Sequence, residues 1–207
     1  MLPPADAQLV QIVDAALADA ARRAGPLLAC RPGCTQCCHG AFAINPLDAL
    51  RLAAGMDTLR THNPMLAGQI ERRAESWIDT HGDDFPGDPA SGLLGETDAD
   101  LQRFAAFAND EPCPALDPAT GLCSVYEHRP MTCRVFGPPV RMDCGIENTD
   151  VLGHCDLCFI GASTAEVAAC EMPLPHAHEA QLLDEIPMHG ETLVAFALLG
   201  RGLASAR

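Results

Sequence analysis

Cysteine is the reactive residue type that stands out in this chain of 207 residues, both in its number and in its uneven distribution. Ten of its eleven cysteines lie in two windows, residues 30–38 and residues 113–158, and Cys170 follows alone. Thiolate sulfur binds zinc, copper(I) and iron, and it is also a nucleophile and a redox group. Clustering on this scale favours metal binding for the ten, whereas a buried, inert thiol suits Cys170.

The amino-terminal window has the form Cys-x3-Cys-x2-Cys-Cys, with Pro32 and Gly33 placed where a tight turn lets sulfurs converge. A second knuckle-like pair has the form Cys-x2-Cys near residue 155. We expect the vicinal Cys37 and Cys38 side chains to diverge, so that one of them faces a second ion or bridges two ions. The candidate metal ligands are Cys30, Cys34, Cys37, Cys38, Cys113, Cys123, Cys133, Cys144, Cys155 and Cys158.

Ten thiolates exceed what one four-coordinate ion can use, so the sequence predicts two metal centres or one polynuclear centre. A single reactive thiol is a competing interpretation. His39, His128 and His154 adjoin or interrupt the cysteine segments, and each could complete a site as an imidazole ligand, although a surface or core histidine is the simpler interpretation for each.

Three arginines lie among the later cysteines and are candidates to offset thiolate charge through N–H contacts: Arg129, Arg134 and Arg141. The chain contains no lysine, which excludes Schiff-base chemistry and a phosphate-binding loop of the Walker type. Its formal net charge of −15 argues against a nucleic-acid partner.

The opening MLPPADAQLV lacks the basic and apolar regions of a secretory signal, and the longest apolar run, residues 193–199, is too short to cross a membrane. The sequence therefore predicts a cytoplasmic protein without membrane contact. In that reducing compartment cysteines bind metal more often than they form disulfides.

The hydrophobic pattern predicts a mainly α fold, a small single helical domain over residues 1–207 with little β structure. Irregular cysteine-rich loops form its metal-binding region, about residues 30–160. An extended segment is expected at 41–44 and an exposed loop at 82–97. Helices are expected from Asp6 (as N-cap) to 24, from 46 to a stop at Gly55, and over 64–80, 98–109, 163–171, 177–186 and 191–199.

The order of motifs resembles the CxxCxxCC cysteine-cluster family of zinc- or iron-chelating domains. The resemblance rests on the amino-terminal window, on Cys-Pro-Ala-Leu from residue 113, and on Cys-Ser-Val-Tyr-Glu-His-Arg-Pro-Met-Thr-Cys-Arg from residue 123. It implies Cys34, Cys37, Cys38, Cys113, Cys123 and Cys133 as ligands, with Cys30 as the amino-terminal member. The first spacing is x3 rather than x2, and Cys144, Cys155 and Cys158 lie beyond the matched stretch, 30 to about 137.

Three functions follow from these observations. The first is a metal-binding protein with one or two cysteine-ligated zinc or iron centres. The second is an enzyme of redox or methyl-transfer chemistry with an iron–sulfur cluster, since the same family pattern is similar to part of a flagellin lysine methylase and the amino-terminal spacing also occurs in radical S-adenosylmethionine enzymes. The third is metal storage or delivery. No motif marks a substrate pocket.

Overall fold

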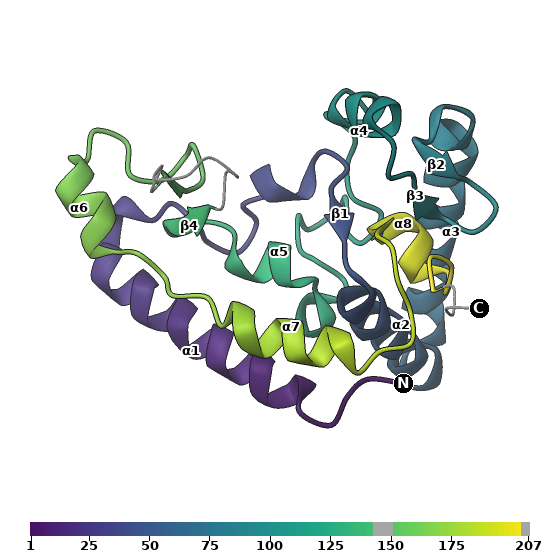
Figure 1. The fold of residues 1–207 in the computed structure, drawn as a ribbon, viewed down its shortest axis with the longest axis horizontal. Helices are drawn as coiled ribbons and strands as arrows, with labels where there is room; N and C mark the ends of the chain where they lie inside the picture. The colour runs from purple at the N-terminus through teal and green to yellow at the C-terminus, as the bar shows by residue number, and fades with distance from the viewer. Residues whose placement is uncertain (143–150, 204–207) are drawn as a thin grey trace. The chain divides into compact units, whose positions relative to one another are not determined.

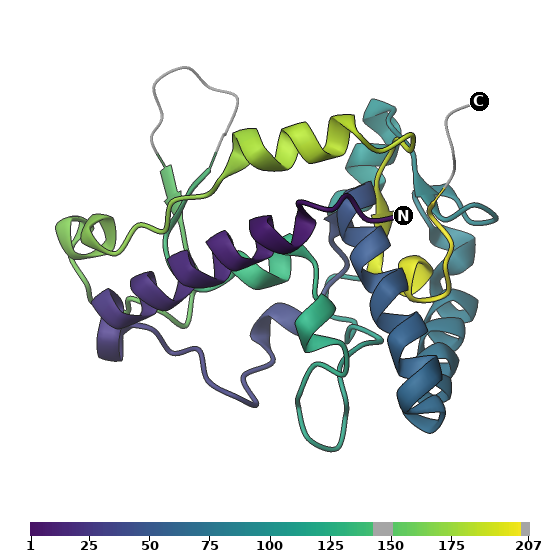
Figure 2. The ribbon, with the colours of Figure 1, turned by 90° about the horizontal axis from the view of Figure 1, so that it is seen from below.

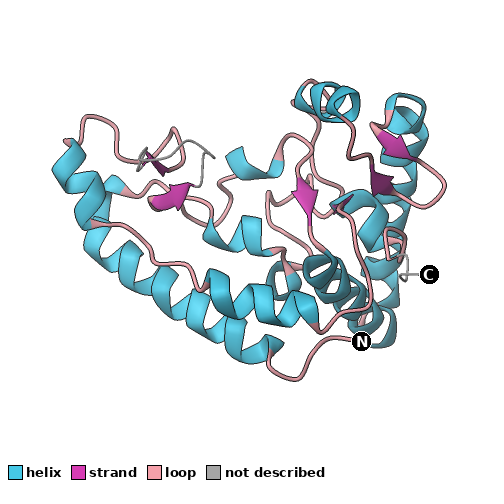
Figure 3. Cartoon of the chain, in the orientation of Figure 1, coloured by secondary structure: helices cyan, strands magenta, loops and turns pink. Residues whose placement is uncertain are grey.

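The computed structural model of the chain describes residues 1–142 and 151–203 and is mainly helical (Figure 3). The α-helices of the described residues are α1 Asp6–Ala24, α2 Pro46–His62, α3 Pro64–His81, α4 Asp98–Ala105, α5 Met131–Val135, α6 Thr164–Ala169, α7 His176–Asp184 and α8 Val194–Leu198. The strands are β1 Ala43–Ile44, β2 Gly87–Asp88, β3 Leu93–Leu94, β4 Val140–Met142, β5 Val151–Gly153 and β6 Thr192–Leu193. The predicted fold class is confirmed.

The chain divides into two compact units. The first unit comprises Met1–Pro3, Pro32–Pro130 and Leu183–Arg207, and the second unit comprises Pro4–Arg31 and Met131–Leu182. The first unit therefore contains α2, α3, α4 and α8, and the second contains α1, α5, α6 and most of α7.

The core of the first unit lies where α2, α3 and α8 pack on one another; α2 and α3 lie side by side in Figure 2. Leu52, Ile70 and Leu198, one from each helix, are fully buried there. Burial of such side chains contributes about 1.5–3 kcal/mol each. Cys113 and Cys123 pack against this same core, so helix packing fixes the segments that carry them.

A short antiparallel sheet in the order β1-β6-β3-β2 flanks α8 (Figure 1). The extended segment predicted at 41–44 is present as β1, but two predictions nearby are wrong. Residues 82–97 contain β2 and β3 rather than only a loop, and 191–199 begins with β6 before α8. Thr192 has a β-branched side chain that favours a strand. Its hydroxyl donates to the Gly92 carbonyl at 2.6 Å, which holds β6 in the sheet.

The predicted stop of α2 at Gly55 is also wrong, because the helix continues to His62. A Cβ at Gly55 would lie 2.6 Å from Cγ of His128, so glycine serves there for close packing rather than for termination. Asp6 is the first residue of α1 and not its N-cap, which is Ala5. Ser163 and Glu166 form a capping box at the start of α6, and α4 ends four residues earlier than expected.

The second unit is organised by α1, against which α5 packs, and by the β4–β5 hairpin. The guanidinium of Arg134, fully buried on α5, donates to both carboxylate oxygens of Asp14 on α1 at 2.7 and 2.8 Å. A separate apolar cluster joins the end of α1 to the cysteine-rich turn near residue 158; its buried members are Ala24, Cys155, Cys158, Phe159 and Cys170.

Candidate metal centres

Backbone pairing brings two distant cysteine segments of the first unit together. The Gly40 N–H donates to the Glu111 carbonyl at 2.9 Å, and the Cys113 N–H donates to the Cys38 carbonyl at 2.7 Å. His39 and Pro112 form an antiparallel bridge between these bonds. Cys38 and Cys113, which are 75 positions apart in the chain, are thus held as neighbours by main-chain hydrogen bonds.

A hairpin then returns the chain to the same place. Leu116 pairs with Cys123, and the Ser124 N–H donates to the Ala115 carbonyl at 2.8 Å. At the tip, Gly121 has φ of +68°, and a Cβ there would lie 3.6 Å from the Cα of Gly33. The hairpin therefore carries Cys123 to the segment that contains the amino-terminal cysteines.

The vicinal thiols of Cys37 and Cys38 do not diverge as the sequence suggested. Both residues lie in a 3₁₀ turn, Gln36–Cys38, and their side chains form a hydrogen bond to each other. This bond is the largest cause that lowers the pKa of Cys37 to about 6, and the same bond raises the pKa of Cys38. The pair therefore holds one proton at neutral pH, with Cys37 as the thiolate.

Burial keeps the thiols of Cys113 and Cys123 in their protonated form. Burial raises the pKa of Cys113 to about 12, and it also raises the pKa of Cys123. Backbone N–H groups act in the opposite direction, from Ala115 and Leu116 on the Cys113 sulfur and from Val125 on the Cys123 sulfur. Such N–H···S bonds stabilise a thiolate once a metal has displaced its proton.

Cys37, Cys38, Cys113 and Cys123, called the four-thiol group below, also act on one another through their charges. The charges of Cys113 and Cys123 contribute to raising the pKa of Cys38, and the charge of Cys37 contributes to raising that of Cys123. Such Coulombic effects require short separations. The four sulfurs therefore occupy one neighbourhood of the first unit.

Two arginines place positive charge next to this group. Arg129 is buried, stacks on the Tyr126 ring with its guanidinium carbon 3.7 Å from the centroid, and lowers the pKa of Cys37 and of Cys123. Arg73 of α3 lowers the pKa of Cys113 and donates to the Pro114 carbonyl at 2.8 Å. Arg129 was expected from the sequence. Arg73 was not, because it lies 40 residues from Cys113 on a helix with no cysteine.

The described side chains do not yet form a metal site. Among residues 1–142 and 151–203, no three His, Cys, Asp or Glu side chains converge as they would around one bound ion. The four-thiol group is therefore a set of neighbouring sulfurs that are not arranged around one point in the described residues.

The second unit brings other cysteines together at Gly137. A Cβ at Gly137, where φ is +128°, would lie 2.7 Å from the Cys30 sulfur, and the Cys155 N–H donates to the Gly137 carbonyl at 3.2 Å. Cys133 lies four residues earlier, on α5. The residue at 137 thus has to be glycine for the Cys30 thiol to approach the backbone so closely.

The remaining predicted ligands are placed as follows. Cys158 is buried and accepts a hydrogen bond from the Ala29 N–H at 3.4 Å. Cys34 is half-buried just before the 3₁₀ turn, and Cys144 lies outside the described residues. Cys170, assigned no metal role, is buried with Cys155 in one apolar cluster.

The three candidate histidines have separate surroundings. His39 Nδ1 lies 3.0 Å from the Thr35 carbonyl, and the charge of this ring is one of the causes that lower the pKa of Cys37. His128 packs on Gly55, and His154 lies against the Phe159 ring at 5.3 Å between centroids.

Of the three arginines expected beside thiolates, two bind carboxylates. Arg134 binds Asp14, and Arg141 donates to both carboxylate oxygens of Glu171 at 3.1 and 2.8 Å. A bidentate carboxylate is a strong partner for a guanidinium, and no pattern in the sequence distinguishes that role from a thiolate contact. Gly137 was also not anticipated, since a glycine before two prolines is the usual signature of a turn.

A helical scaffold that gathers thiols on irregular segments defines a metal-chelating class of protein. The chain belongs to the CxxCxxCC family, described as a putative zinc- or iron-chelating domain, whose match covers residues 29–158. Comparison with curated proteins and with solved structures gave no match. No helix in the described part of the chain has the length and apolar character needed to cross a membrane.

Proposed function

We propose that the protein binds zinc or iron at two cysteine centres, one in each unit. The four-thiol group forms the first centre, with Cys34 beside it. Cys30, Cys133, Cys155 and Cys158 belong to the second, together with Cys144, which lies outside the described residues. Each set has enough thiolates for a four-coordinate ion.

The observation that carries the proposal is the electrostatic coupling within the four-thiol group. Cys38, Cys113 and Cys123 have raised pKa values and lie next to one thiolate. Ionising any one of these thiols raises the pKa of the others, so without a cation the group cannot ionise together near neutral pH. A divalent cation reverses this relation and favours all four thiolates together. The N–H groups already directed at two of the sulfurs fit thiolate better than thiol.

The first centre would connect segments that have little regular structure of their own. It would join the 3₁₀ turn at Gln36–Cys38 to the hairpin that carries Cys123, which packs on the core of α2, α3 and α8. A closed centre of four thiolates has a structural role, because no coordination position is left for a substrate. The described cysteines are free thiols rather than disulfides. Because the cytoplasm keeps thiols reduced, we also propose a cytoplasmic location.

Metal analysis of the full chain after anaerobic purification tests the proposal, followed by titration of the metal-free protein with Co²⁺ as a coloured substitute for zinc. We expect about two equivalents per chain and thiolate-to-cobalt charge-transfer absorption for both. Uptake of less than one equivalent would contradict the proposal. Cys170→Ser is the matched control and should titrate like the unchanged protein.

The same preparation separates the alternatives. Colour in the purified protein together with iron and acid-labile sulfide would favour an iron–sulfur enzyme. A metal content that rises and falls with supply, with ions lost readily to a weak chelator, would favour storage or delivery. Colourless protein with a fixed zinc content would favour the structural role.

A further inference from the structure

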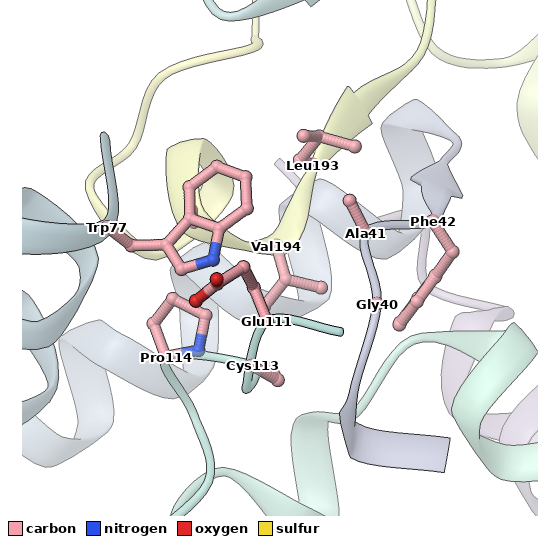
Figure 4. A pocket seen from close by; sticks show the side chains of 10 residues that line it. Gly40, Ala41, Phe42, Trp77, Glu111, Cys113, Pro114, Leu193 and Val194 are labelled. Carbon is pink, nitrogen blue, oxygen red and sulfur yellow. The ribbon is translucent and has the colours of Figure 1, made fainter. Parts of the chain in front are cut away.

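A groove of about 530 Å³ runs along α3 in the first unit, within the size range of small-molecule sites. One wall is the face of α3 that carries Gln69, Arg72, Ser76 and Thr80. The other wall is the proline-rich segment 111–118. Trp77, also on α3, lines the groove and a small neighbouring cavity (Figure 4).

The two walls differ in chemistry. Gln69, Arg72 and Ser76 are hydrogen-bond donors, and spacings of three and four residues align them on one face of the helix. The Thr80 hydroxyl instead donates to the Ser76 carbonyl of the same helix at 2.8 Å. The facing wall offers apolar surface from Pro112, Pro114 and Pro118. Figure 4 shows the Glu111 carboxylate beside the Trp77 indole and next to Pro114. A ligand that matches this groove has a polar, electron-rich side and a flat apolar side.

The charge of the groove is unusual for this protein, which has 28 acidic and 13 basic residues. At least seven of the arginines in the described residues form ion pairs with carboxylates. Arg72 and Arg73 have no such pair among the described residues, although both line the groove. The one lining carboxylate, on Glu111, lies 3.6 Å from His81 Nε2.

The two arginines have different roles. Arg73 is half-buried, and its Nε and Nη2 atoms donate to the Pro114 carbonyl at 2.8 Å and to the Ser124 hydroxyl at 3.4 Å. It therefore positions the hairpin. Arg72 is exposed, so its guanidinium is available to a ligand in the groove. In an acidic protein an unpaired arginine beside hydroxyl and amide donors is a recognition element for an anion.

We infer that this groove binds a small organic anion, with a carboxylate or phosphate head on the Arg72 side and a flat apolar body between Trp77 and the prolines. The inference concerns side chains outside the proposed metal centres, apart from Cys113, which also lines the groove. It does not depend on which metal the protein holds.

The single tryptophan of the chain, Trp77, reports directly on the groove. The purified full chain is titrated with benzoate, phenyl phosphate, inorganic phosphate and benzyl alcohol while its tryptophan fluorescence is recorded. Saturable quenching is expected with benzoate or phenyl phosphate, and the tighter of the two identifies the head group. Inorganic phosphate should bind more weakly, because it lacks the apolar body, and benzyl alcohol should produce no saturable change.

Arg72→Ala should weaken binding of the aromatic anion about tenfold, the size of one charge-assisted hydrogen bond, and Arg72→Glu should abolish it. Arg201→Ala is the matched control, because Arg201 is also exposed in the first unit but does not line the groove. Circular dichroism checks that each variant is folded. The inference is overturned if the neutral alcohol quenches as well as the anions, if no probe saturates, or if the two alanine variants behave alike.

Discussion

The cysteines of the two units differ in what surrounds them. In the first unit four thiols are coupled to one another by charge and hydrogen bonds, next to two arginines. In the second unit Cys155, Cys158 and Cys170 are at most 5% exposed and share an apolar cluster with Phe159. The first set of thiols thus lies among charges and hydrogen-bond partners, whereas the second is surrounded mainly by apolar side chains. We therefore expect the two proposed centres to differ in how readily they gain and lose metal.

The largest expected effect distinguishes a coupled thiol from a merely buried one. Cys123→Ser should abolish metal binding in the first unit, together with part of the helical circular dichroism, because the hairpin loses the bond that ties it to the 3₁₀ turn. Cys170→Ser should retain the full metal content and cost about 1–2 kcal/mol of unfolding free energy for a buried hydroxyl. Equal metal content and equal stability in the two variants would contradict the assignment.

Zinc affinity of the first unit should depend steeply on pH. The pKa of Cys37 is about 6, so this residue is already a thiolate at neutral pH, whereas the raised pKa values of Cys38, Cys113 and Cys123 keep three protons bound until zinc displaces them. Affinity should therefore rise with pH by up to three decades per unit, about 1000-fold between pH 6.5 and 7.5. Competition with a chelator of known pH dependence measures it. A slope of one decade or less would show that the four thiols do not act together.

Gly137→Ala tests whether Cys30 and Cys155 meet at the backbone of the second unit. The added Cβ would overlap the Cys30 sulfur, and φ of +128° adds strain, so we expect a loss of roughly 2–3 kcal/mol and of one metal equivalent. Gly161→Ala is the matched control, since it has a positive φ in the same unit but nothing within 4 Å of the new Cβ. Retention of metal by both variants would remove Gly137 from the second centre.

The smallest effect concerns the charge beside the four-thiol group. Arg129→Ala should raise the pKa of Cys37 by roughly half a unit and slow its alkylation by iodoacetamide in the metal-free protein about threefold at pH 5, where the thiol is mostly protonated. Arg141→Ala, in the second unit and paired with Glu171, should leave that rate unchanged. Mass spectrometry of the modified peptide gives both rates. An unchanged rate in Arg129→Ala would show that its role is confined to the Tyr126 contact.

Helical periodicity was sufficient to predict α1 and α3, because each has a continuous apolar face and proline or glycine near its ends. It failed at α2, where Gly55 accommodates His128, since a glycine inside a pattern gives no sign of what packs against it. The strands β2, β3 and β6 are two residues long, too short for a period-2 pattern to be recognised.

The candidate ligands could be taken from the sequence, but their grouping could not. Cys123 and Cys133 are ten positions apart and belong to one motif, yet they lie in different units, whereas Cys38 and Cys113 are paired across a long separation by main-chain hydrogen bonds. Arg73 reaches Cys113 only through the packing of α3. Such long-range contacts depend on tertiary structure, and the spacing of residues along the chain does not determine which distant residues meet.

If the two units bind metal independently, as we propose, a variant that lacks one cysteine should lose the metal of one unit only, which metal analysis can measure. We predict about two equivalents in the unchanged chain, and about one in both Cys113→Ser and Cys155→Ser. Each substitution should remove the metal of its own unit and leave that of the other unit in place. The double variant should therefore hold no metal. A single substitution that removes all the metal, or one that removes none, would contradict the account.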